Sequence, residues 1–313
     1  MNTRPGTLFV VATPLGNPGD LSPRAASTLR DADVIVAEDT RTARRLLSEN
    51  RAAREDRPVI SCYDANEASR AGEVAALLAA GKNVALVSEA GTPLLSDPGF
   101  RVVAAAIAAG APVVPIPGPS AVLAALVAAG LPTDRFLFLG FPPRKSGARR
   151  RLFEGVRALP FTLVFYESPL RAGATLEDLA AVLGADRRAC VARELTKPYE
   201  ELVRDTLGAL AERYRETRPL GEVTLVVAGA PDGATAEAPL DEEEITERAT
   251  ELLAKGVSAR DAADQLAALT DRPRREVYRL VVAAGARRAA GNDESDADDA
   301  DGGEPGDGTK TEG

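Results

Sequence analysis

Histidine is absent from this chain of 313 residues, and cysteine occurs only twice, as Cys62 and Cys190. The lack of histidine excludes Ser-His-Asp and Cys-His catalysis, HExxH metalloproteases and histidine-ligated zinc or haem. Two cysteines are too few for a zinc site of four thiolates, so we expect no metal site. Two distant thiols are typical of a reduced cytosolic protein and not of a disulfide framework, which predicts a cytoplasmic location.

Uninterrupted apolar segments of membrane-spanning length are lacking as well. Residues 102–133 carry no charge, yet glycines and prolines divide them into pieces shorter than the roughly 20 residues of a spanning helix. These breaks are Gly110, Pro112, Pro115, Pro117, Gly118 and Pro119. The N-terminal residues also lack the apolar segment and cleavage site of a secretory signal. We therefore expect neither a membrane span nor a signal peptide.

Most of the negative charge is confined to the C-terminal segment. Residues 291–313 hold nine acidic residues against Lys310, a net charge of −8, so the remaining residues carry only −1 of the total of −9. The segment has no apolar residue larger than alanine, and we expect residues 289–313 to form a disordered acidic tail. The nearly neutral body can still present basic patches to a nucleic acid.

The order of apolar runs predicts two α/β domains. Nearly continuous apolar runs, typical of parallel strands covered on both faces, alternate with alanine- and leucine-rich helical runs in residues 1–118. The predicted strands there are 7–12, 34–37, 84–88 and 112–116. A second α/β domain, with a sheet that could be mixed, is predicted for 119–231. Its predicted strands are 135–140, 162–166, 189–193 and 223–228.

Three short helices are predicted in residues 240–288, after a linker rich in glycine, alanine and proline. Asp241 is a suitable N-cap, and the acidic residues after it favour the start of a helix. So small a region cannot form a large core. We expect it to pack on the main body or to act as a docking module.

Glycine- and proline-rich turns follow three of the predicted parallel strands, at 12–20, 88–99 and 115–121. The chain has neither the G-x-G-x-x-G nor the G-x-x-x-x-G-K-[ST] motif, which disfavours classical dinucleotide and P-loop sites. In an open α/β sheet, ligands bind beyond the carboxyl ends of the strands. Small residues let the backbone approach a ligand closely, so the three turns predict a site for a flat cofactor rich in heteroatoms.

Charged residues gather at three places in the body. Glu38, Asp39 and Arg41 follow a predicted buried strand, which indicates a polar site or a helix start capped by acids. The run 144–151 is basic and lies between Phe141 and Phe153, which indicates RNA-phosphate contacts or a solvated loop. A second basic cluster lies around the third C-terminal helix. The candidate RNA contacts are Arg41, Arg144, Lys145, Arg149, Arg150, Arg151, Arg274 and Arg275.

Together these motifs resemble the ribosomal RNA small subunit methyltransferase I family, within the tetrapyrrole-methylase-like methyltransferases that use S-adenosyl-L-methionine (SAM). The resemblance covers nearly everything except the acidic tail. The segments that carry it are GTLFVVATPLGNPGDLSPRA (6–25), ADVIVAEDTRTARRLL (32–47), VALVSEAGTPLLSDPGFRVV (84–103), VVPIPGPSAVLAAL (113–126), GLPTDRFLFLGFPPRKSGARR (130–150), FYESPLR (165–171), ARELTKPYEE (192–201) and GEVTLVVAG (221–229).

The resemblance implies two α/β domains with SAM in the cleft between them, a small helical extension and a homodimer. It implies 2′-O-methylation of cytidine 1402 in 16S rRNA of the 30S subunit. The cofactor residues that it implies are Thr13, Pro14, Leu15, Gly16, Ser88, Glu89, Ala90, Gly91, Thr92, Ser120, Ala121, Phe165 and Tyr166.

Departures from the family pattern bear on the chemistry. The family usually has Asp at Glu89, Leu at Pro18, and histidines in the segments 61–67 and 166–171, so a histidine base is not required here. A ribose 2′-OH is a poor nucleophile and benefits from a positioned base. The polar candidates for this role are Asp39, Glu167, Glu194 and Lys197. The alternatives are a small-molecule or tetrapyrrole methyltransferase, or a non-catalytic RNA-binding factor of ribosome assembly.

Overall fold

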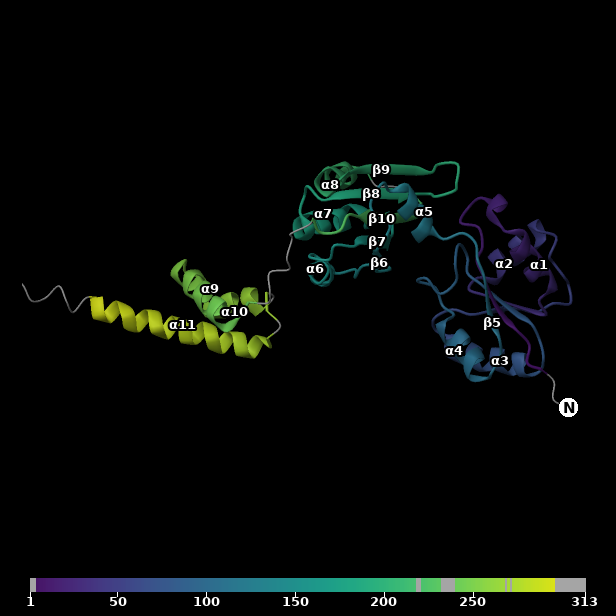
Figure 1. Ribbon diagram of the computed structural model, residues 1–313, viewed down its shortest axis with the longest axis horizontal. Coiled ribbons are helices and arrows are strands. Elements are labelled where there is room, and N and C mark those ends of the chain that lie inside the picture. The colour runs from purple at the N-terminus through teal and green to yellow at the C-terminus, as the bar shows by residue number, and fades with distance from the viewer. Residues whose placement is uncertain (1–3, 218–220, 232–239, 268, 271, 296–313) are drawn as a thin grey trace, which may run out of the picture. The chain divides into compact units, whose positions relative to one another are not determined.

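The computed structural model describes residues 4–217, 221–231, 240–267, 269–270 and 272–295. The chain divides into two compact units, residues 1–232 and 233–313, which are described separately. Both predicted α/β regions lie in the first unit, each built around its own sheet (Figure 1).

The first sheet is fully parallel, with strand order β3-β2-β4-β1-β5. Every residue of β2 and β4 is buried, because these central strands are apolar throughout and covered on both faces. The sequence did not predict β3, a short, half-buried edge strand. The strands are β1 (Leu8–Val11), β2 (Val34–Ala37), β3 (Val59–Ser61), β4 (Val84–Val87) and β5 (Val113–Ile116).

Helices cover both faces of this sheet. On one face α1 (Pro23–Asp31) and α2 (Thr40–Glu49) pack on the side chains of Ile35 and Ala85. On the other, α3 (Glu67–Ala79) and α4 (Phe100–Ala108) enclose a second apolar cluster. Ser22 caps α1 and proline follows it at the first helical position, which favours the start of a helix. A short 3₁₀ helix, η1 (Pro18–Asp20), follows the first turn.

The second sheet is mixed, with order β6-β7-β10-β8-β9. Only β6 and β7 run parallel, and the other pairs are antiparallel. The sequence did not predict β9, an edge strand whose residues are half-buried or exposed and partly charged. The strands are β6 (Phe136–Phe138), β7 (Thr162–Glu167), β8 (Arg188–Arg193), β9 (Glu201–Thr206) and β10 (Val223–Val227).

The two faces of the second sheet have different coverings. One is covered by α6 (Ser146–Glu154), α7 (Ala172–Leu183) and α8 (Leu207–Glu216). On the other face lies α5 (Ala121–Ala128), which follows the last strand of the first sheet. Leu15, in the turn after β1, joins the same apolar cluster as α5. The first turn of one sheet is therefore held against the face of the other.

The second unit contains α9 (Glu242–Ala254), α10 (Ala259–Ala267) and α11 (Arg274–Ser295). Asp241 and Glu244 form a capping box at α9, in agreement with the predicted start. The three helices and Leu240 enclose a core of nine buried apolar residues, four of which are alanine.

Helix α11 runs to Ser295 and so includes residues 289–295, which the sequence assigned to the acidic tail. The rest of the predicted tail, 296–313, lies outside the described residues. In the described part of the chain, no helix combines the length and apolar character of a membrane span.

Candidate cofactor and substrate site

The three turns singled out in the sequence meet at the carboxyl edge of the first sheet. Thr13 and Gly91 exchange two backbone hydrogen bonds, with N···O distances of 2.8 and 3.0 Å. The hydroxyl of Thr92 donates to the carbonyl of Pro119 at 3.0 Å. The turns 12–20, 88–99 and 115–121, called the cofactor loops below, are thus bonded into one surface.

Two glycines let these loops approach each other closely. Gly91 has φ +80°, and a Cβ there would lie 3.1 Å from Cδ2 of Leu15. A Cβ on Gly118 would lie 3.1 Å from the Cβ of Ala12. Side chains at these positions would force the loops apart, and positive φ favours glycine. The resulting cradle, lined by backbone, fits a flat cofactor rich in heteroatoms.

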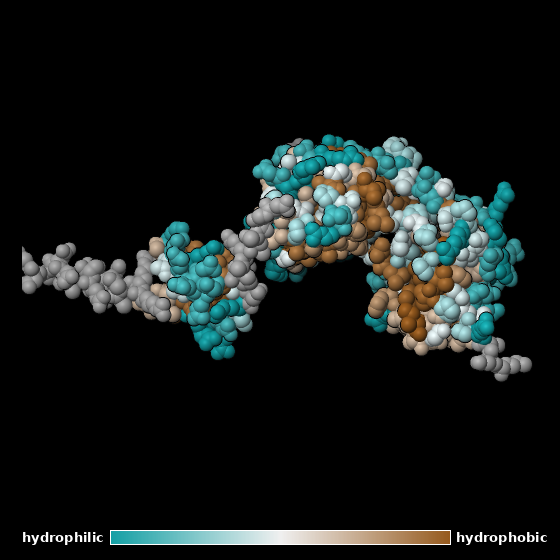
Figure 2. Space-filling view, in the orientation of Figure 1, coloured by the Kyte–Doolittle hydropathy of each residue, from teal (hydrophilic) through white to brown (hydrophobic). Residues whose placement is uncertain are grey.

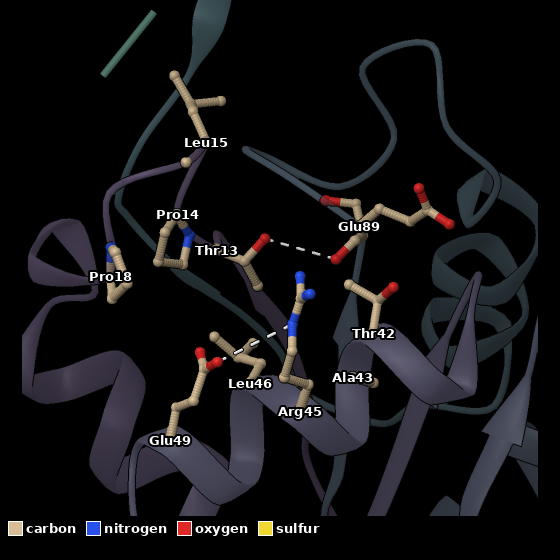
Figure 3. Close-up of a pocket in the computed structure, with 12 residues that line it drawn as sticks. Thr13, Pro14, Leu15, Pro18, Thr42, Ala43, Arg45, Leu46, Glu49 and Glu89 are labelled. Atoms are coloured by element: carbon tan, nitrogen blue, oxygen red, sulfur yellow. Dashed lines mark hydrogen bonds and ion pairs between the residues drawn. The ribbon is translucent and has the colours of Figure 1, made fainter. Parts of the chain in front are cut away.

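A pocket opens beside this cradle, between two cofactor loops and helix α2 (Figure 3). Six of the predicted cofactor residues line it, namely Thr13, Pro14, Leu15, Gly16, Ser88 and Glu89. The rest of its wall is Pro18 and, from α2, Thr42, Ala43, Arg45, Leu46 and Glu49. We call it the α2 pocket. The structure therefore adds a wall from α2 to the residues found from the sequence.

The remaining predicted cofactor residues are distributed around the loops. Ala90, Gly91 and Thr92 continue the second loop, and Ser120 precedes α5, which starts at Ala121. Phe165 is fully buried in the core on the other face of the second sheet, so its side chain cannot contact a ligand.

Tyr166 lies on the α5 face of the second sheet and stacks edge-on against Phe138, with a centroid distance of 4.9 Å. Burial, together with the charge of Asp97, raises the pKa of Tyr166 to about 12. Its hydroxyl is therefore protonated at neutral pH and can donate a hydrogen bond.

Asp39 is the N-cap of α2. Its carboxylate accepts hydrogen bonds from the backbone N–H groups of Arg41 and Thr42 and pairs with the Arg41 guanidinium at 2.9 Å. The Arg41 side chain, followed by these backbone bonds, lowers the pKa of Asp39 to about 2. A carboxylate held so firmly in its ionised form is a weak proton acceptor.

Glu167 is buried at the end of β7, and both of its carboxylate oxygens have polar partners. It pairs with Arg171 at 2.6 Å and accepts hydrogen bonds from the Thr175 hydroxyl and the backbone N–H of Ser168. These contacts tie β7 to α7, which gives Glu167 a structural role.

Lys197 and Glu194 lie beside the first cofactor loop. A Cβ on Gly16 would collide with Cγ of Lys197, and the backbone N–H of Asn17 donates to the Thr196 hydroxyl at 3.2 Å. Burial lowers the pKa of Lys197, but its hydrogen bond to Glu194 and the charge of Glu222 raise that pKa by more. The same hydrogen bond lowers the pKa of Glu194. Lys197 is therefore protonated at neutral pH and cannot act as the base considered from the sequence.

Asp97, in the second cofactor loop, is a functional candidate that the sequence reasoning missed. Burial and then the charge of Glu38, with further contributions from Glu89 and Asp64, raise the pKa of Asp97 to about 6. A carboxyl with this pKa is a better proton acceptor at neutral pH than Asp39. The available signal was its place in the loop 88–99, which the sequence had already singled out.

The basic run 144–151 is largely helical, and its arginines differ in exposure. The side chain of Arg149 is 4% exposed, and its guanidinium pairs with the buried Asp178 and donates to the carbonyl of Ala174. Arg150 also pairs with Asp178, at 2.6 Å. The structure removes Arg149 from the candidate RNA contacts, because its side chain is buried. Arg144, Lys145 and Arg151 are exposed.

The other candidate RNA contacts are at the surface. Arg41 is 88% exposed and pairs with Asp39. Arg274 and Arg275 are exposed at the start of α11 in the second unit, where Arg274 pairs with Asp264.

Comparison with known proteins identifies the class. The family model described as Tetrapyrrole (Corrin/Porphyrin) Methylases matches residues 7–211. The fold also resembles uroporphyrin-III C-methyltransferase from Thermus thermophilus, solved with S-adenosyl homocysteine (TM-score 0.50, 21% identity, covering 71% of this chain and 97% of that one). It resembles a diphthine synthase as well (TM-score 0.54, 18% identity, 88% and 100% covered). The chain thus has the fold of the tetrapyrrole methylase class, and the family model places it there.

Sequence relatives narrow the class. Proteins named ribosomal RNA small subunit methyltransferase I from Micromonospora olivasterospora and Synechocystis sp. are each 45% identical to this chain, over 88% of its length and over 86% and 98% of theirs. The chain belongs to the ribosomal RNA small subunit methyltransferase I family. The resemblance drawn from the sequence motifs is thereby confirmed.

Proposed function

We propose that this chain is a SAM-dependent methyltransferase acting on ribosomal RNA of the small subunit. The observation that carries the proposal is the cradle of three bonded, glycine-bearing loops at the carboxyl edge of a parallel sheet, in a member of this family. The relatives are named for the same activity.

The residues of the cradle fit SAM. Gly91 and Gly118 keep side chains out of the loop junction, which leaves backbone N–H and C=O groups to bind a heteroatom-rich ligand. When bound, SAM supplies an activated methyl group. The protein has to hold the donor and align a ribose hydroxyl with it, and alignment alone can lower the barrier substantially.

We propose cytidine 1402 of 16S rRNA, within the 30S subunit and in the cytoplasm, as the target, with its 2′-OH as the methylated group. The exposed cations Arg144, Lys145 and Arg151 support an RNA substrate, because a macrocycle needs no row of phosphate contacts. The 2′-OH is also the group that distinguishes RNA from DNA.

Transfer of labelled methyl groups from SAM tests this function. The purified chain is offered 30S subunits, naked 16S rRNA and a porphyrinogen, and we expect methylation of the 30S subunit at the ribose of cytidine 1402. Methylation of the porphyrinogen instead would support the small-molecule alternative. No SAM binding by calorimetry would support a non-catalytic assembly factor.

Two loop variants test the cofactor cradle. Gly91→Val and Ala121→Leu should abolish SAM binding, because each places bulk at a loop of the cradle. Gly72→Ala, where no heavy atom lies within 4 Å of the added Cβ, is the matched control. Circular dichroism checks that each variant is folded. Wild-type SAM affinity in both folded loop variants would contradict the assignment.

We also propose that the chain forms a homodimer. Phe100 and Ile107 on α4, and Leu123 and Val127 on α5, are each more than half exposed. Figure 2 shows apolar surface on the unit formed by residues 1–232. Light scattering should give the mass of a dimer, and Val127→Glu should shift it toward the monomer. A monomeric wild type would overturn this proposal.

A further inference from the structure

Helix α2 supplies almost half of the wall of the α2 pocket. The proposed cofactor site gives these α2 residues no role. Arg45 extends from α2 toward the loops, and Figure 3 shows its guanidinium between Thr13, Glu89 and Thr42. This places a cation directly beside the loops proposed to hold the methyl donor. The pocket therefore has a second, charged side that a second ligand would contact.

The guanidinium of Arg45 is weakly engaged. Its ion pair with Glu49 is long, with Nε···Oε1 at 3.9 Å. By contrast, Arg171 and Arg193 in the same unit hold their carboxylates at 2.6 Å. A guanidinium has five N–H donors in a fork that matches a phosphate. Arg45 can therefore exchange a loose intramolecular partner for an anionic ligand.

The burial of the pocket residues separates two subsites. Thr13 and Ser88, from the loops, are 1% and 6% exposed, whereas the side chain of Arg45 is 74% exposed. A small cofactor belongs at the buried loops, and a polymer that continues beyond the pocket belongs at the open rim. The anion that passes this rim in an RNA is the phosphodiester.

We propose that Arg45 binds a backbone phosphate of the RNA nucleotide that presents its ribose to the cofactor loops, and that Glu49 competes with this phosphate for the guanidinium. The proposal rests on the proposed function, since it takes RNA as the substrate. It adds a positioning contact on α2 that neither basic cluster contains. By fixing the phosphate, Arg45 would limit how the adjacent ribose can face the methyl donor.

The test compares four variants of the full chain in binding to 30S subunits at several salt concentrations. Arg45→Ala should weaken binding about threefold to tenfold and lower the slope of log affinity against log salt by roughly one unit. Arg45→Lys should recover part of the affinity, because it restores charge without the fork. Glu49→Gln should strengthen binding, because it removes the competing carboxylate. Arg30→Ala, which removes an exposed charge of the same unit away from the pocket, is the control.

Calorimetry with SAM separates the two subsites. SAM affinity should be unchanged in Arg45→Ala. A loss of SAM affinity would assign Arg45 to the carboxylate of the cofactor and overturn the proposal. Equal 30S affinity and salt slope in wild type, Arg45→Ala and Arg30→Ala would also overturn it.

Methyl transfer by the wild type is measured in parallel. A wild type that binds 30S subunits but does not methylate them would refute the proposed function, and the binding series would still decide the role of Arg45.

Discussion

Asp178 on α7 is a buried carboxylate that determines which arginines of α6 are paired. It accepts hydrogen bonds from the Ser146 hydroxyl at 2.9 and 3.0 Å and pairs with Arg149 and Arg150 of α6. Arg149 is thereby enclosed, although its sequence neighbours are exposed. Asp178 thus joins α6 to α7 and leaves Arg144, Lys145 and Arg151 free to face solvent.

Replacement of Asp178 by alanine should lower the free energy of unfolding by about 3–5 kcal/mol, because it leaves the Arg149 charge buried without a carboxylate to balance it. Denaturant unfolding measures the loss. Glu177→Ala on the same helix removes an exposed carboxylate paired with Arg215 at 3.3 Å and should cost at most about 1 kcal/mol. An equal loss of unfolding free energy in the two variants would show that the buried pair stabilises the fold no more than the exposed pair.

Asp97 should make stability depend on pH. Its pKa is raised from 3.8 to about 6 in the folded chain by burial and by the charges of Glu38, Glu89 and Asp64, with the Ser88 hydroxyl acting in the opposite direction. A raised carboxyl pKa means that the fold favours the protonated form. This contribution to stability is therefore complete below about pH 4 and is lost as the pH rises through about 6.

Asp97→Asn should accordingly raise the melting temperature above about pH 6, and the gain should vanish below about pH 4. Thermal unfolding from pH 3.5 to 8 measures it. Asp134→Asn, at a carboxylate 72% exposed and distant from the cluster, is the control and should show no such dependence. A constant difference between Asp97→Asn and wild type at all pH values would contradict the proposed cause.

Helix α6 divides the basic run 144–151 into buried and exposed side chains. Helical spacing and the Asp178 contacts place Arg149 inside and Arg151 outside, a distinction that a solvated loop would not make. The start of α6 follows Phe141, whose ring centroid lies 5.6 Å from that of Tyr166. The segment that leads into α6 is therefore in contact with Tyr166, whereas α6 itself packs on the other face of the sheet with α7 and α8.

Replacement of Arg144, Lys145 and Arg151 by alanine should weaken 30S binding and lower its salt slope by up to roughly three units, since each phosphate contact contributes about one. SAM affinity should be unchanged, because none of the three lines the cofactor loops. The control replaces three other exposed arginines, Arg24, Arg30 and Arg54. If the salt slope of 30S binding falls equally in both triple variants, the decrease reflects the overall charge of the chain and not specific contacts by these three side chains.

At the scale of the whole molecule, the apolar cores are separate. Of the five apolar clusters, four consist of residues in the first unit, and the fifth consists of residues between Leu240 and Ala284. Among the described residues, no core cluster draws on both units. Each unit therefore has an apolar core of its own, and the first also contains all the cofactor loops.

A fragment of residues 1–232 should thus fold and bind SAM like the full chain. Its main thermal transition should lie within a few degrees of that of the full chain, since no apolar core is cut. Its affinity for 30S subunits should fall, because Arg274 and Arg275 are removed. The control is the full chain with both arginines changed to alanine, which should also lose affinity although it keeps the acidic residues 291–313. An unfolded fragment would show that the second unit is needed for the fold of the first.

The central parallel strands, the turns that follow them and the family can all be predicted from the order of residues. These features are local, because apolar runs, capping residues and glycine positions act within a few residues of the chain. The edge strands β3 and β9 were missed, since short, half-buried strands have little apolar pattern of their own. Which charged side chains are buried or paired depends instead on how the chain folds. Asp178 encloses Arg149, the charge of Glu222 helps to raise the pKa of Lys197, and burial followed by the charge of Glu38 raises the pKa of Asp97. Each of these partners comes from another part of the chain and is brought into place by folding.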